Sequence, residues 1–128
     1  MKIDILTLFP DMFTGFLNES IIKRAMDRNL VTIQVHNIRD YSPFKNKQVD
    51  DYQYGGGAGM VLMCEPIFAA IEDLKKEDTL VLMMSPSGKN FKEQLAKEYS
   101  LKKHIILLCG HYEGFDERIK TIVDEEIS

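Results

Sequence analysis

The sequence predicts an α/β domain with a mostly parallel sheet flanked by helices. Two runs, TLVLMM at 79–84 and HIILLC at 104–109, are apolar at every position after the first, which is typical of strands buried on both faces of a parallel sheet. Segments with helical periodicity separate these strands, and such alternation of strands and helices favours parallel pairing. The length of 128 residues fits one domain with one core.

The elements of the amino-terminal part follow from periodicity and from the residues that interrupt it. KIDILTLF at 2–9 predicts a buried first strand that Pro10 ends. Two short helices follow, with an N-cap between them at Asn18 or Ser20. Their apolar faces are Met12, Phe13, Phe16 and Leu17 in the first and Ile21, Ile22, Ala25 and Met26 in the second. VTIQVHN at 31–37 is β-branched and alternating, so we expect a second strand there.

The remaining elements begin after a long segment without periodicity, 38–59. Connections of this length are unusual in compact domains unless they are functional or disordered. A helix with Pro66 near its start follows, and KNFKEQLAKEYS and FDERIKTI predict two more helices. The apolar residues expected to face inward are Ile67, Ala70, Ile71 and Leu74, then Phe91, Leu95 and Tyr99. The chain stops at VDEEIS, which resembles the approach to a further strand or loop, so we expect a truncation there.

Composition limits the function classes. The net charge of −4 gives no global attraction to phosphates, so binding of nucleic acid would need a local basic patch or a second domain. Cys64 and Cys109 are far apart and form no C-x-x-C pair, which indicates reduced core thiols in a cytoplasmic protein. Lys2 and Asp4 interrupt the first apolar run, and no segment approaches the roughly 20 apolar residues of a membrane span. We therefore expect no membrane partner.

Two loops directly after buried strands are candidates for a ligand site. SPSG at 85–88 follows TLVLMM, and GHYEG at 110–114 follows HIILLC. Ligands of parallel sheets bind beyond the carboxyl ends of the strands, where such loops converge. Glu113 is a candidate base, because partial burial beside Tyr112 would raise its pKa. Ordinary strand-to-helix turns and a solvated glutamate remain the alternatives.

The stretch DDYQYGGGAGM at 50–60 concentrates four glycines without any periodicity. Glycine costs folding entropy unless the backbone needs unusual angles or close approach. The dinucleotide pattern G-x-G-x-x-G fails because Met60 or Leu62 stands where its last glycine should be, and SGKN places Asn90 where a P-loop needs Ser or Thr. The histidines show no metal-ligand spacing, so we expect no metal site.

Several motifs together resemble one family. They are LFPDMF at 8–13, VDDYQYGGGAGMVL at 49–62, SPSG at 85–88, CGHYEGFDERI at 109–119 and DEEIS at 124–128. In this order and spacing they resemble the bacterial tRNA (guanine-N1)-methyltransferases of the SPOUT superfamily. The resemblance implies a methyl transfer from S-adenosylmethionine to N1 of the guanosine immediately 3′ of the anticodon of tRNA. It also implies a trefoil knot and a cytoplasmic homodimer with active sites between the subunits.

The resemblance also assigns residues to the site. The cofactor-binding residues that it implies are Met84, Ser85, Pro86, Gly110, Tyr112, Glu113, Gly114 and Ser128. The wall of the guanosine pocket that it implies consists of Tyr54, Gly55, Gly56, Gly57 and Gly59. Asp50 and Glu113 are the catalytic candidates: Asp50 would orient the guanine, and Glu113 would hold the guanine or the surroundings of the cofactor. A requirement for magnesium is left open.

The family pattern continues beyond the last residue of this chain. The third cofactor loop of the family begins at the position of Ser128, and the proposed general base and the C-terminal tRNA-binding domain come after it. We therefore expect residues 1–128 to be a partial N-terminal S-adenosylmethionine-binding domain, inactive alone and without the part that completes the knot. Two other classes stay open: a non-catalytic RNA-binding or dimerisation module on the same scaffold, and a small-ligand-binding domain without a nucleic-acid partner.

Overall fold

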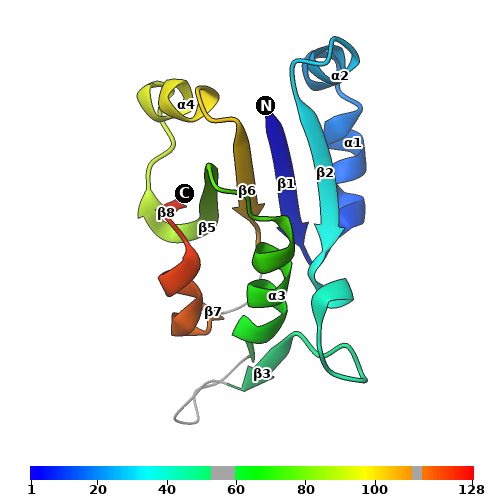
Figure 1. Cartoon of the computed structure of the whole chain (residues 1–128), viewed down its shortest axis with the longest axis vertical. Helices are drawn as coiled ribbons and strands as arrows, with labels where there is room; N and C mark the ends of the chain where they lie inside the picture. The colour runs from blue at the N-terminus through cyan, green and yellow to red at the C-terminus, as the bar shows by residue number, and fades with distance from the viewer. Residues whose placement is uncertain (53–59, 111–113) are drawn as a thin grey trace.

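The main sheet has five strands, all of them parallel. A computed structural model describes residues 1–52, 60–110 and 114–128. The sheet order is β2-β1-β6-β5-β8. The strands are β1 (Lys2–Thr7), β2 (Thr32–Asn37), β5 (Thr79–Lys89), β6 (His104–Leu108) and β8 (Glu125–Ile127). The arrows of β1, β2 and β6 point toward the bottom of Figure 1. The predicted mostly parallel sheet is confirmed.

Helices lie on both faces and beside one edge of this sheet (Figure 1). The α-helices are α1 (Thr14–Leu17), α2 (Ser20–Asp27), α3 (Cys64–Leu74) and α4 (Glu93–Ser100). The 3₁₀ helices are η1 (Pro10–Phe13), η2 (Ile38–Tyr41) and η3 (Glu117–Ile122). In the described part of the chain, no helix combines the length and the apolar character that a bilayer crossing requires.

The two faces of the sheet carry separate apolar clusters. The face under α3 holds the larger one, which includes Leu6, Val81, Met83, Ile106 and Leu108 from the strands and Ile67, Ala70 and Ile71 from α3. The opposite face packs Leu82, Ile105 and Ile127 against Tyr99 of α4. Because neighbouring residues of β5 and β6 belong to different clusters, these strands are apolar at nearly every position, as the sequence predicts.

A second, three-stranded sheet lies beyond the carboxyl edge of the first. Its strands are β3 (Asp50–Tyr52), β4 (Met60–Leu62) and β7 (Gly114–Phe115), in the order β3-β4-β7. β3 and β4 pair antiparallel, whereas β4 and β7 pair in parallel. The segment 38–59 is therefore not without structure, because η2 begins it and β3 lies within it. The side chain of Asn37 caps η2 by accepting a hydrogen bond from the Arg39 amide at 3.0 Å.

The amino-terminal helices differ from the prediction in their cap and in their burial. The N-cap residue of α2 is Glu19, not Asn18 or Ser20, and its side chain makes no capping hydrogen bond. Met12 and Ile21 are 66% and 79% exposed. The reason is that these helices lie beside the edge strand β2 (Figure 1), so the described residues cover their apolar faces only in part, and Ile22, Ala25 and Met26 are half-buried.

Two further differences concern β5 and α4. β5 extends to Lys89 and thus includes the predicted loop SPSG, because its end pairs with β8 after a register shift between Met84 and Lys89. Phe91 lies outside α4 and is 53% exposed. Its ring stacks on that of Tyr99, with centroids 6.3 Å apart, instead of filling the core.

A buried carboxylate links β1 to the strands on both of its sides, the edge strand β2 and the central strand β6. Asp4 is fully buried, and its Oδ1 and Oδ2 each lie 2.7 Å from the Nε2 of a histidine, His36 of β2 and His104 of β6. The Nδ1 of His104 lies 2.5 Å from the hydroxyl of Thr79 on β5. Burial raises the pKa of Asp4, but the hydrogen bonds from both histidines and the charge of Lys2 outweigh it, so the net shift of this pKa is downward. This carboxylate therefore fastens β1 to both of its neighbours.

Candidate functional site

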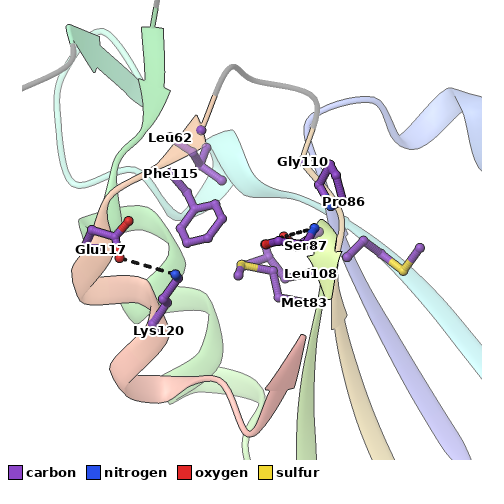
Figure 2. A pocket seen from close by; sticks show the side chains of 12 residues that line it. Leu62, Met83, Pro86, Ser87, Leu108, Gly110, Phe115, Glu117 and Lys120 are labelled. Atoms are coloured by element: carbon purple, nitrogen blue, oxygen red, sulfur yellow. Dashed lines mark hydrogen bonds and ion pairs between the residues drawn. The ribbon is translucent and has the colours of Figure 1, made fainter. Parts of the chain in front are cut away.

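A pocket of about 400 Å³ lies at the carboxyl ends of β5 and β6 (Figure 2). β5 and β6 supply Met83, Met84, Ser85, Pro86, Ser87 and Leu108 to its lining, and Gly110 follows just after β6. β4, β7 and η3 supply Leu62, Gly114, Phe115, Glu117 and Lys120. The volume falls within the range of roughly 300–1,000 Å³ that small-molecule sites occupy. The position is the one at which parallel sheets bind ligands.

The β5 wall is formed by the irregular end of that strand. Met84 pairs with Ile127, and after the register shift Lys89 pairs with the same residue. The strand therefore bulges between these two positions and turns the hydroxyls of Ser85 and Ser87 toward each other, with their Oγ atoms 3.0 Å apart. Ser85 is buried, so this wall presents a polar pair within an apolar lining.

Gly88 fixes the bulge against β8. A Cβ built on Gly88 would lie 2.5 Å from the amide nitrogen of Ile127 and 2.6 Å from the carbonyl carbon of Glu126. Both are backbone atoms, so a side-chain rotation cannot relieve the clash. Glycine at this position thus allows the backbones of the two strands to approach closely.

The β6 wall begins where the chain leaves the main sheet. The Cys109 amide donates a hydrogen bond to the Leu6 carbonyl at 2.9 Å, the last such contact before Gly110 enters the lining. Burial raises the pKa of the Cys109 thiol to about 11. Burial, together with the hydrogen bond that the Cys64 thiol donates to Glu65, raises the pKa of Cys64 to about 11 as well. Both thiols stay protonated near neutral pH. Cys64 belongs to the larger apolar cluster, as predicted for a core residue, whereas Cys109 is only half-buried and lies outside both clusters.

The η3 wall is held in place by an aspartate cap. The Asp116 carboxylate accepts hydrogen bonds from the Arg118 amide at 2.9 Å and from Nη2 of Arg118 at 2.6 Å. These hydrogen bonds keep the pKa of Asp116 below its usual value. The Asp116 amide donates to the Leu62 carbonyl at 2.9 Å, which ties the start of η3 to β4. The wall therefore has a fixed position relative to the small sheet.

The η3 wall carries the charged side chains of the described lining. The Nζ of Lys120 lies 3.5 Å from Oε2 of Glu117 and 5.7 Å from the centre of the Phe115 ring. Figure 2 shows this ion pair on the side of the pocket opposite Ser87. The pocket thus combines an apolar body, two hydroxyls on one wall and a pair of opposite charges on the other. Such a lining suits a small molecule with both apolar and charged parts.

The structure places the sequence-predicted site residues in three groups. Met84, Ser85, Pro86, Gly110 and Gly114 all line the pocket. Asp50 on β3 and Ser128 after β8 do not line the pocket. Asp50 is half-buried and pairs with Leu62, and the Ser128 amide donates to the Lys89 carbonyl at 2.8 Å. The predicted residues that lie outside the described part of the chain are Tyr54, Gly55, Gly56, Gly57, Gly59, Tyr112 and Glu113.

Sequence reasoning missed Leu62, Phe115, Glu117 and Lys120, all of which line the pocket, whereas Ser87 belongs to the predicted candidate loop SPSG. Glu117 and Lys120 are three residues apart in a segment predicted to be helical, so one shared face could have been inferred. That this face meets a pocket depends on the pairing of β4 with β7, for which the sequence has no short-range signal. In the described residues, no group of three or more His, Cys, Asp or Glu side chains is arranged to hold a metal ion.

Comparison with known proteins gives consistent matches over the whole chain. The family model described as "tRNA (Guanine-1)-methyltransferase TrmD" matches residues 1–128. Proteins named "tRNA (guanine-N(1)-)-methyltransferase" from Dictyoglomus turgidum, Carboxydothermus hydrogenoformans and Clostridium novyi are 54%, 54% and 57% identical to it. Each match covers 100% of this chain but 52%, 51% and 53% of the respective relative. The chain therefore spans about half the length of the curated relatives it matches.

Proposed function

Because the chain belongs to the tRNA (guanine-1)-methyltransferase family, we propose that its protein methylates tRNA with S-adenosylmethionine as the methyl donor. The methyl group goes to N1 of the guanosine immediately 3′ of the anticodon. The names of the relatives support the reaction class, since each contains the words tRNA and guanine-N(1). The methyl donor and the position in tRNA are the more specific parts of the proposal.

The observation that carries the proposal is the pocket at the carboxyl ends of β5 and β6. It brings together Met84, Ser85 and Pro86 from one strand end with Gly110 and Gly114 from beyond the other. These are residues that the sequence resemblance assigns to the methyl donor. The size of the pocket and its mixture of apolar, hydroxyl and charged groups fit a nucleoside that carries an amino-acid chain.

The residues of this chain would act mainly by positioning. S-adenosylmethionine, when bound, supplies a methyl group on a positively charged sulfur. Ser85 and Ser87 offer hydroxyls for hydrogen bonds, and the apolar side chains of Met83 and Leu108 keep water from the lining. Holding the two reactants in line accounts for a large part of such catalysis. Guanine N1 must also lose its proton, so a base is needed.

Asp50, Glu113 and the glycine-rich segment 54–59 are proposed for the guanine side of the site. Asp50 would accept hydrogen bonds from the guanine N–H groups, and Glu113 would hold the guanine or the cofactor surroundings.

We expect Glu113→Gln to lower kcat more than it weakens S-adenosylmethionine binding. Equal losses in both would contradict this role. We expect Gly59→Val to abolish methylation by filling the guanosine pocket, and unchanged methylation would contradict that assignment.

The remaining parts of the proposal concern the whole protein. Residues 1–128 would be part of an N-terminal methyl-donor domain with a trefoil knot, and tRNA binding would also need a C-terminal domain. The protein would act as a homodimer in the cytoplasm. Light scattering of the natural full-length protein measures the oligomeric state, and a monomeric mass would contradict the dimer.

The experiment that tests the function measures methyl transfer from labelled S-adenosylmethionine to tRNA by the natural full-length protein. The matched control is the same tRNA with adenosine in place of the guanosine 3′ of the anticodon. We expect label only in the first tRNA. Equal labelling of both, or no labelling of either, would contradict the proposal. Reactions with MgCl₂ and with EDTA determine whether magnesium is required.

A further inference from the structure

We propose that Glu117 and Lys120 form the subsite for the amino-acid end of the methyl donor, with Lys120 binding its carboxylate and Glu117 its ammonium group. The inference rests on the proposed function, because it takes S-adenosylmethionine as the ligand of the pocket. It adds two specific contacts and an orientation of the ligand, which neither the family match nor the names of the relatives provide.

The first argument is the distribution of charge in the pocket. Among the described lining residues, Glu117 and Lys120 carry the charged side chains, and both come from η3. Their carboxylate and ammonium groups are 3.5 Å apart. The Lys120 ammonium also lies over the Phe115 ring, which lines the same pocket. A zwitterion brings its own carboxylate and ammonium groups within a few bonds of each other, so one such pair of side chains can bind both.

The second argument is that the two ends of the pocket differ in the same way as the two ends of the ligand. The β5 and β6 side presents Met83, Leu108 and the hydroxyls of Ser85 and Ser87. These groups suit a neutral nucleoside, which has flat apolar faces and hydroxyl groups. The η3 side is charged (Figure 2). The ligand would therefore lie with its nucleoside against the main sheet and its amino-acid chain toward η3.

The third argument is that the ion pair is free to rearrange around a ligand. The side chains of Lys120 and Glu117 are 46% and 81% exposed. Exposed ion pairs of this kind contribute little to stability. Exchanging the internal partner for a ligand group of the same charge therefore costs little. The Phe115 ring keeps the lysine near the pocket through its attraction for cations.

The competing explanation is that the pair only stabilises η3, since residues three apart on a helix commonly form such contacts. If the pair only stabilised η3, its removal would change the affinity for every ligand of the pocket by the same factor or leave all affinities unchanged. If the pair is a subsite for the amino-acid end, its removal lowers the affinity only for ligands that have this end. This difference makes the two explanations separable by binding measurements.

The experiment compares two probes by calorimetric titration into the natural full-length protein. S-adenosylhomocysteine has the amino-acid end, and 5′-methylthioadenosine lacks it. We expect Lys120→Met and Glu117→Gln each to weaken S-adenosylhomocysteine binding about fivefold, as expected for a partly exposed charge contact. Binding of 5′-methylthioadenosine should stay unchanged. Lys120→Arg, which keeps the charge, should restore most of the lost affinity.

Lys97→Met is the matched control. Lys97 forms a comparable exposed pair with Glu93 on α4, at 3.6 Å, and neither residue lines the pocket. It should leave the binding of both probes unchanged. Equal effects of the η3 variants on the two probes, or no effect on either, would overturn the subsite while the proposed function stands. If the unmodified protein binds neither probe, the proposed function itself fails.

Discussion

Replacing Gly88 by alanine tests how strictly the pocket wall depends on the contact between β5 and β8. The added Cβ would meet the Ile127 nitrogen at 2.5 Å and the Glu126 carbonyl oxygen at 2.8 Å. Ordinary contacts of a Cβ begin about 0.9 Å further out, so one strand must move. β8 is held at this point by the hydrogen bond from the Ser128 amide to the Lys89 carbonyl, 2.8 Å long.

The expected cost follows from the kind of atoms that the Cβ meets. Overpacking a well-packed site costs about 1–3 kcal/mol, and backbone neighbours place this site at the upper end. With a urea m-value of about 1.5 kcal/mol/M, a loss of about 3 kcal/mol lowers the midpoint of unfolding by about 2 M. Because the same movement displaces Ser85 and Ser87, S-adenosylhomocysteine binding should weaken at least tenfold.

Urea unfolding and calorimetric titration of the natural full-length protein measure both effects. Gly15→Ala is the control, since nothing lies within 4 Å of a Cβ at Gly15 in α1. That change should leave stability unchanged or raise it slightly. A Gly88→Ala protein with the midpoint and the affinity of the unmodified protein would show that the β5–β8 contact does not set the wall.

Three other predictions concern parts of the fold away from the pocket. Asp4→Asn should cost about 3 kcal/mol at pH 7, because it removes a buried charge that two histidines bind. Since the folded pKa of Asp4 is lowered, the stabilisation is complete above its ordinary value of 3.8 and is lost as the pH falls through the folded pKa. In urea unfolding, the difference in stability between the two proteins should therefore stay constant from pH 7 down to about 4 and shrink as the pH falls further, and a difference that does not shrink in acid would contradict the assignment. Because the pKa of Cys109 is about 11, its alkylation by iodoacetamide at pH 8, followed by mass spectrometry, should be at least tenfold slower than that of a free thiol. Ile67→Ala should lower the free energy of unfolding by about 2–5 kcal/mol, whereas Ile21→Lys should change it by less than about 0.5 kcal/mol, because the first side chain is 0% and the second 79% exposed; similar losses would refute the burial that the structure assigns.

The sequence predicted those elements whose signals are local. The continuous apolar runs of β5 and β6 indicated a parallel sheet, and Pro66 with the apolar face behind it indicated α3. Those signals need only neighbouring residues. The extension of β5 through Pro86 was missed because it depends on β8, whose pairing residues are some 40 positions away.

The same distinction between local and long-range signals explains which parts of the site could be predicted. Loops after adjacent parallel strands must meet at one edge, so the junction of Ser85 with Gly110 could be predicted from order alone. The η3 wall could not, because Glu117 and Lys120 reach the pocket through the pairing of β4 with β7. The exposure of Ile21 could not be predicted either, because an apolar helix face predicts burial but does not identify the surface that covers it.

The position of β1 has a consequence for how the chain folds during synthesis. β1 is made before its neighbours and lies inside the sheet between β2 and β6, and β6 follows about 100 residues later. At about 5–20 residues per second, a ribosome needs about 5–20 s between Asp4 and His104. During that time β1 can pair only with β2, and its other edge is open to strands of other chains. The nascent chain is therefore expected to depend on chaperones until β6 emerges.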